Sequence, residues 1–116
     1  MKKVNKVWGE ETWVVNSENY CGKILELKKD FRCSIHHHKN KDETFFLLSG
    51  MILLELDEKK RIMNPGDSQR VKPGQKHSFA GIENSKIIEF STHHKDSDSY
   101  RLNKSRFESV KIGDLR

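Results

Sequence analysis

Four side chains that can bind a transition metal lie in two short stretches of the sequence. The stretch "HHHKNKDE" contains His36, His38 and Glu43, and the later stretch "KPGQKH" ends at His77. Alternate side chains of a β-strand face the same side, so His36 and His38 would point together and His37 would point away. A tight connection after His38 would bring Glu43 back beside them. Three imidazoles and one carboxylate suit one divalent metal ion, such as Zn, Mn, Fe or Ni, with positions left for substrate or water.

Short strands are the elements that must hold these residues. From Lys23 to Thr92 the apolar residues come in clusters of four to eight, separated by turn-forming residues. Such spacing is typical of an all-β sandwich or barrel. The expected strands are residues 23–27, 31–38, 43–50, 51–56, 61–64, 68–71, 77–81 and 86–92. No stretch before Asp96 keeps a helical pattern, and residues 105–116 could form either a helical turn or a last strand.

Composition predicts a single folded domain over residues 1–116. Hydrophobic and charged residues each make up 34% of the chain, and the formal net charge is +5. The basic residues are scattered, so we expect neither a nucleic-acid partner nor a membrane partner. The N-terminus lacks the apolar stretch of a signal peptide, and the two cysteines form no dense framework. The expected location is therefore cytoplasmic, with both thiols reduced.

The two stretches resemble the motifs of the cupin superfamily. "HHHKNKDETFFLLSG" is similar to the first cupin motif, with His36, His38, Glu43 and Gly50 in register. "GDSQRVKPGQKH" is similar to the second, with one extra residue between Gly66 and Pro73. The resemblance covers about residues 20–92. It implies a cupin double-stranded β-helix, or jelly-roll barrel, with an N-terminal arm, one metal in its mouth and a homodimeric assembly.

Flanking stretches resemble a narrower group of cupins, the sugar isomerases. "VWGEETWVVNSENYCGKILEL" is similar to the lead-in of mannose-6-phosphate isomerase cupin domains, and "IIEFSTHHKDSDSYRL" resembles the tail of D-lyxose isomerases. The resemblance implies aldose-ketose isomerisation of a small-molecule sugar or sugar phosphate. In that reaction a metal chelates adjacent carbonyl and hydroxyl oxygens and stabilises the enediolate, while a positioned base moves the proton.

Glu89 is the candidate base of such a reaction. Glu89 would share one strand face with Ile87, and the alternative is that Glu89 faces solvent while Ile88 and Phe90 fill the core. The other catalytic candidates are Lys23 and Arg101, and the substrate-binding candidates are Tyr20, Tyr100 and Phe79. Each of the polar candidates could equally be an ordinary exposed side chain.

Two histidines that follow the last predicted strand, His93 and His94, are expected to be solvated, and the alternative is that they reach the pocket mouth or shuttle protons. The reaction itself stays open at this point, because cupins include enzymes of several classes and non-catalytic binders. The alternatives are a sugar-binding or regulatory cupin of a carbohydrate pathway and an iron-dependent dioxygenase.

Overall fold

The computed structural model describes residues 1–110, which form β-strands joined by turns. The strands are β1 (Lys2–Lys6), β2 (Gly9–Asn16), β3 (Cys21–Leu27), β4 (Phe31–Arg32), β5 (His36–His37), β6 (Glu43–Ser49), β7 (Ile52–Leu56), β8 (Lys59–Met63), β9 (Ser68–Val71), β10 (His77–Gly81), β11 (Ser85–Ser91), β12 (Tyr100–Arg101) and β13 (Arg106–Phe107). A single 3₁₀ turn, η1 (Asp96–Asp98), follows β11. The predicted strands are confirmed, except that the one over residues 31–38 divides into β4 and β5. Of the uncertain segment 105–116, β13 is a strand, and residues 111–116 lie outside the described part.

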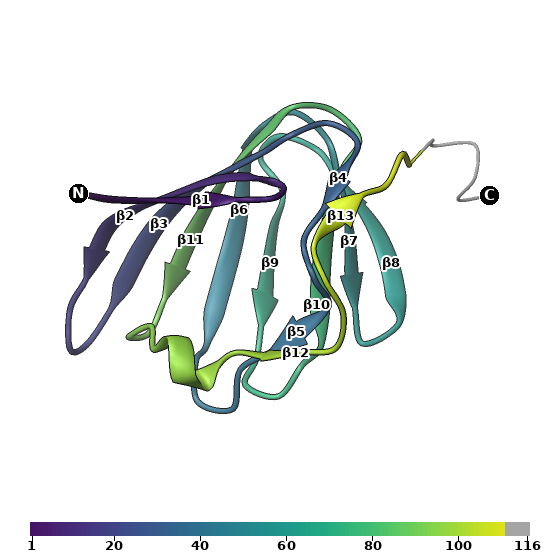
Figure 1. Ribbon diagram of the computed structural model, residues 1–116. Helices are drawn as coiled ribbons and strands as arrows, with labels where there is room; N and C mark the ends of the chain where they lie inside the picture. Colours follow the sequence, from purple (N-terminus) through teal and green to yellow (C-terminus); the bar gives the residue numbers. More distant parts are fainter. Residues whose placement is uncertain (111–116) are drawn as a thin grey trace.

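Two antiparallel sheets make up the barrel (Figure 1). One has the order β1-β2-β3-β11-β6-β9, and the other has the order β12-β5-β10-β4-β13, with β7 joined to β10 and β8 joined to β7. This arrangement confirms the all-β jelly-roll prediction. Within residues 1–110, no helix has the length and apolar character that crossing a membrane would require.

The inner face of the six-stranded sheet changes from apolar to charged along its strands. At one end, Leu25, Ile87 and Leu47 are neighbours on β3, β11 and β6 and are buried. Each of these side chains stabilises the barrel by about 2 kcal/mol through burial. Toward the other end the same inward positions carry Lys23, Glu89 and Glu43, which are also buried. The barrel therefore has an apolar floor and a polar mouth.

The predicted N-terminal arm is an integral part of this sheet. Strands β1 and β2 form a hairpin, and β2 pairs with β3 along its length. The turn needs Gly9, because its φ is +149° and a Cβ there would lie 1.8 Å from the carbonyl oxygen of Glu26. Beside it, the Trp8 side chain is buried in the core. The hairpin thus extends the barrel wall.

The chain after β11 returns across the barrel as a C-terminal strap, defined here as residues 96–108. Figure 1 shows η1, β12 and β13 running from the end of β11 along β5 and β4. Strand β12 pairs with β5, and β13 pairs with β4. The buried guanidinium of Arg32 forms an ion pair with Glu108 near the end of the strap. These contacts place the strap beside the histidine-bearing segment.

Candidate metal centre

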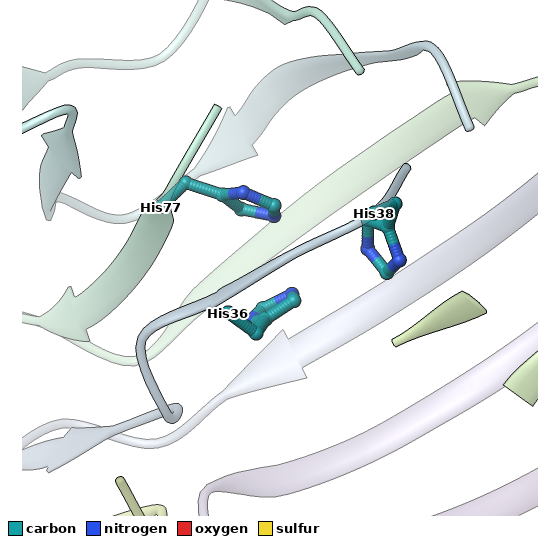
Figure 2. Close-up of side chains that lie close together, drawn as sticks. All are labelled: His36, His38 and His77. Carbon is teal, nitrogen blue, oxygen red and sulfur yellow. The ribbon is translucent and has the colours of Figure 1, made fainter. Parts of the chain in front are cut away.

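Three imidazoles converge in the polar mouth of the barrel (Figure 2). His36, His38 and His77 each offer one ligand atom, and these atoms lie within 4.8 Å of one another. The antiparallel pairing of β5 with β10 sets His36 directly opposite His77. His37 faces away and stacks on Tyr100, with 5.1 Å between ring centroids. The predicted division of the three consecutive histidines is therefore what the structure shows.

The hydrogen bonds of the three rings fix which nitrogen can bind a metal. Each Nδ1 faces a backbone carbonyl, which can only accept a hydrogen bond. The pairs are His36 with Ser34 at 2.8 Å, His38 with Asp98 at 3.0 Å and His77 with Gln75 at 3.2 Å. Each Nδ1 therefore carries the proton of the neutral ring, and each Nε2 presents a lone pair. Metal-binding histidines almost always donate their other ring N–H to such a carbonyl or to a carboxylate, which fixes the orientation of the ring.

Glu43 adjoins this group on the side of His77. Its Oε2 lies 3.2 Å from His77 Nε2, and neither buried atom has a hydrogen-bond partner within residues 1–110. Its other oxygen, Oε1, is 3.7 Å from His38 Nε2. Two facing lone-pair atoms without a donor are what a bound cation would satisfy, so the residues fit a metal ion. That Glu43 is the fourth ligand stays a prediction.

Burial sets the charge states of these groups. The pKa of His36 falls to about 3 because burial and the neighbouring His77 disfavour the charged ring. Burial also lowers the pKa of His38. Burial alone would raise the pKa of Glu43, but nearby positive charge, that of Lys41 in particular, lowers it below the usual range. At neutral pH the site therefore presents neutral His36 and His38 rings beside an ionised carboxylate.

Metal-free protein should lose stability as the pH falls below the ordinary histidine range. The unfolded chain protonates His36 near its ordinary pKa of 6.5, whereas the folded chain does so only near 3. Between these values the unfolded state binds more protons, so the free energy of unfolding should fall by about 1 kcal/mol per pH unit. Urea denaturation in EDTA at pH 7.5, 6.5 and 5.5 measures this slope, and His36→Gln should reduce it. A stability that stays level or rises toward pH 5.5 would contradict the burial of a neutral His36.

Glu89 points into the barrel, beside the histidines. Its side chain is buried, and Ile88 and Phe90 lie on the opposite face, where Phe90 is 58% exposed. Lys41 Nζ lies 2.7 Å from Glu89 Oε2, and the Ser91 hydroxyl donates to the same oxygen at 2.8 Å. The alternative in which Glu89 faces solvent is therefore wrong. Its role as a base stays a prediction.

Two further polar residues lie in the mouth: Lys41, which was not predicted, and His94, for which a place at the mouth was only the alternative. Lys41 is buried, with its Nζ 3.1 Å from Glu43 Oε1 and 2.9 Å from His94 Nδ1. The other ring nitrogen of His94 lies 2.9 Å from Asp96, and burial and the charge of Lys41 lower the pKa of His94. The expectation that His94 is solvated is wrong, because its side chain is only 9% exposed. The sequence does contain a signal for Lys41. Inward-facing residues alternate along β6, and extending this alternation back from Glu43 by two positions reaches residue 41.

The remaining predicted residues divide into two groups. Lys23, Phe79 and Arg101 line the cavity that His36 and His38 also line. Buried Lys23 lies 3.5 Å from Glu11, a cavity residue that the sequence did not reveal. Tyr20 and Tyr100 are absent from the lining, because Tyr20 is exposed beside a turn and Tyr100 stacks on the outward His37. The geometry therefore gives the two tyrosines no contact with this cavity.

An antiparallel barrel with a histidine cluster in its mouth defines the class of protein. The sequence model of the cupin domain matches residues 23–90, more than half of the chain. The chain therefore belongs to the cupin family, as its motifs suggested. The match begins after β2 and ends before the C-terminal strap, so both of those segments lie outside the part shared with the family model.

Known proteins extend the comparison. A protein described as an oxidoreductase from Arthrobotrys oligospora is 28% identical over 100 residues, which cover 83% of this chain and 39% of that protein. Among solved structures, KdgF from Halomonas sp. is similar with a TM-score of 0.71 and 19% identity, covering 76% of this chain and 81% of that one. A variant of oxalate decarboxylase from Bacillus subtilis gives a TM-score of 0.78 and 17% identity, covering 87% of this chain and 30% of that one. At 19% and 17% identity, these two comparisons show a shared fold and nothing further.

Proposed function

We propose that this cupin is a metal-dependent isomerase that moves a proton between neighbouring carbons of a small sugar or sugar phosphate. The observation that carries the proposal is the buried Glu89, which lines the same cavity as His36 and His38 and is held by Lys41. A buried carboxylate in a cavity lined by other titratable groups is a feature of acid-base sites. A protein that only binds a sugar needs no such group.

The proposed metal would be held by His36, His38 and His77, with Glu43 as the fourth ligand. When bound, the metal supplies a Lewis acid that draws electron density from adjacent sugar oxygens and acidifies the neighbouring C–H bond. Glu89 takes that proton and returns it to the adjacent carbon, and the hydroxyl proton moves from its oxygen to the former carbonyl oxygen, so the carbonyl and hydroxyl exchange places and no atom is lost. The net change is an aldose converted to its ketose.

Neighbouring groups orient Glu89 for this transfer. Lys41 and Ser91 both contact Oε2 of the carboxylate, which leaves Oε1 as the oxygen that faces a substrate. Because Lys41 also lies 3.1 Å from Glu43, one ammonium group fixes the base relative to the predicted metal ligand. On the floor of the cavity, Phe45 and Phe79 are buried and exclude water from beneath the reacting carbons.

Glu89→Gln should abolish proton exchange while leaving ligand binding nearly intact. Removing a positioned base lowers a rate by at least about a hundredfold, whereas the isosteric amide keeps the shape of the cavity. Metal-replete protein is incubated in deuterated water with aldoses, ketoses and their phosphates, and deuterium at the carbon next to the carbonyl is followed by NMR. Glu26→Gln, on the outer face of β3, is the matched control and should exchange at the parent rate.

Two results of this experiment would count against the proposal. Exchange by Glu89→Gln at the parent rate would show that another group is the base. If no sugar of the panel incorporated deuterium with the parent protein, the isomerase assignment itself would fail, and binding without exchange would indicate a sugar-binding cupin.

A second candidate function is an iron-dependent dioxygenase. The specific observation that favours it is the 28% identity to a protein described as an oxidoreductase. Three imidazoles and a carboxylate also suit iron. An oxygen electrode distinguishes the two, because a dioxygenase consumes oxygen with its substrate and stops under nitrogen, whereas an isomerase turns over equally in both.

A further inference from the structure

One cation of the cavity differs from the others in having no carboxylate partner in the described part of the chain. The lysines of the cavity are paired: Lys6 and Lys23 with Glu11 at 3.8 and 3.5 Å, and Lys41 with Glu43 and Glu89 at 3.1 and 2.7 Å. Arg101 also lines the cavity, yet the ion pairs formed within residues 1–110 do not include it. Arg101 is exposed at the mouth of the cavity, where a ligand can reach its side chain. Because the cavity lysines are paired with carboxylates, Arg101 is the cation best placed to bind a negatively charged ligand.

The strap holds Arg101 beside the metal centre. In the antiparallel pairing of β12 with β5, Arg101 is opposite His36, so the two side chains leave the sheet on the same face about 5 Å apart at their Cβ atoms. The backbone on either side is anchored, because the Leu102 N–H donates to the Ile35 carbonyl at 2.8 Å and the Ile35 N–H donates to Asn103 Oδ1 at 2.7 Å. A long, flexible side chain therefore starts from a fixed point next to a predicted metal ligand.

We propose that Arg101 forms an anion-binding subsite and that the sugar substrate of this cavity carries an oxyanion, either a carboxylate or a phosphate. The inference deepens the proposed function, because it assumes that the same cavity takes the substrate. A guanidinium binds either group through two parallel hydrogen bonds. Ser105 lines the same wall, and its Oγ accepts the Ser34 N–H at 3.1 Å. Among residues 1–110 its O–H has no acceptor, so it can donate to the anion. Both groups belong to the strap.

Calorimetric titration of zinc-loaded protein tests the subsite with D-glucuronate, D-glucose 6-phosphate and neutral D-glucose. At least one anionic sugar should bind about ten- to a hundredfold more tightly than glucose, the range expected for a hydrogen-bonded charge. Whichever anion gains the advantage identifies the carboxylate or the phosphate as the recognised group. Arg101→Gln should remove the advantage, and because the zinc stays in place, this variant separates binding by Arg101 from direct binding of the anion to the metal.

Lys104→Gln is the matched control, since it removes a positive charge from an exposed position of the same strap that is absent from the cavity lining. In this variant the ratio of anionic-sugar affinity to glucose affinity should stay within about twofold of the parent ratio, because surface charges separated from the ligand are screened. Equal affinity for the anionic and neutral sugars, or an advantage that survives Arg101→Gln, would overturn the subsite. The binding measurement does not depend on turnover. If the protein binds the anion through Arg101 but exchanges no deuterium, the isomerase proposal is wrong and the anion-binding subsite is still supported.

Discussion

Alanine at His36, His38 or His77 is expected to lower zinc affinity at least about a hundredfold, because each ring supplies one of three converging Nε2 atoms. Mutation of a residue that only supports a metal ligand already lowers metal affinity about ten- to a hundredfold. Loss of a ligand itself should lower the affinity further. His37→Ala is the matched control: its ring faces away and stacks on Tyr100, so affinity should stay within about threefold of the parent. Zinc content by mass spectrometry after dialysis, and competition with a chelating dye, give the values.

Equal loss of zinc in all four variants would contradict this account, since only three of the four rings converge. His77 is buried in β10, so its replacement also removes packing. Circular dichroism and urea denaturation of each metal-free variant separate loss of the site from loss of the fold. A folded His38→Ala protein with parent-like zinc affinity would remove that ring from the metal centre.

The sequence predicted the strands well because period-two alternation is a local property. In β6, Glu43, Phe45 and Leu47 are buried, while the residues between them face outward. The same alternation identified the outward His37 and set Glu89 on one face with Ile87. It could not choose between the two faces of β11, because Ile88 and Phe90 offered an equally apolar alternative. Only the packing of β11 between β3 and β6 decides that Ile87 and Glu89 face inward.

The parts of the site that escaped prediction depend on contacts between distant segments. His94 follows the last long strand in a polar stretch, and its burial comes from Trp13 of the N-terminal hairpin, whose ring lies 5.0 Å away. The two-residue strands of the strap are too short to carry a periodic signal. Asp98 accepts hydrogen bonds from three consecutive backbone N–H groups at 39–41, a contact across 57 to 59 residues that no local pattern encodes.

Lys41→Met should destabilise the metal-free protein by about 3–5 kcal/mol, because it leaves the buried carboxylates of Glu43 and Glu89 without their shared cation. Lys39→Met is the matched control, since Lys39 is an exposed lysine two positions earlier in the same loop. Its change should stay within about 1 kcal/mol, the size of the exposed cation–π contact that Lys39 makes with the Tyr100 ring. Urea denaturation in EDTA at pH 7 measures both differences, and Lys41→Arg, which keeps the positive charge, should recover part of the loss.

The pH dependence of this loss separates charge from packing. In the parent, burial raises the pKa of Glu43, but the charge of Lys41 helps to lower it below the ordinary value of 4.5. The contribution of Glu43 to stability is therefore present above pH 4.5 and fades only as the pH falls through the lower folded value. Without Lys41, a buried carboxylate takes up a proton more readily and avoids the cost of an unpaired charge. The difference in the free energy of unfolding between the parent and Lys41→Met should therefore become smaller from pH 7 toward pH 4.5. A gap that stays constant over this range would mean that Lys41 stabilises the barrel through packing, and that the ammonium is not what holds Glu43 and Glu89 together.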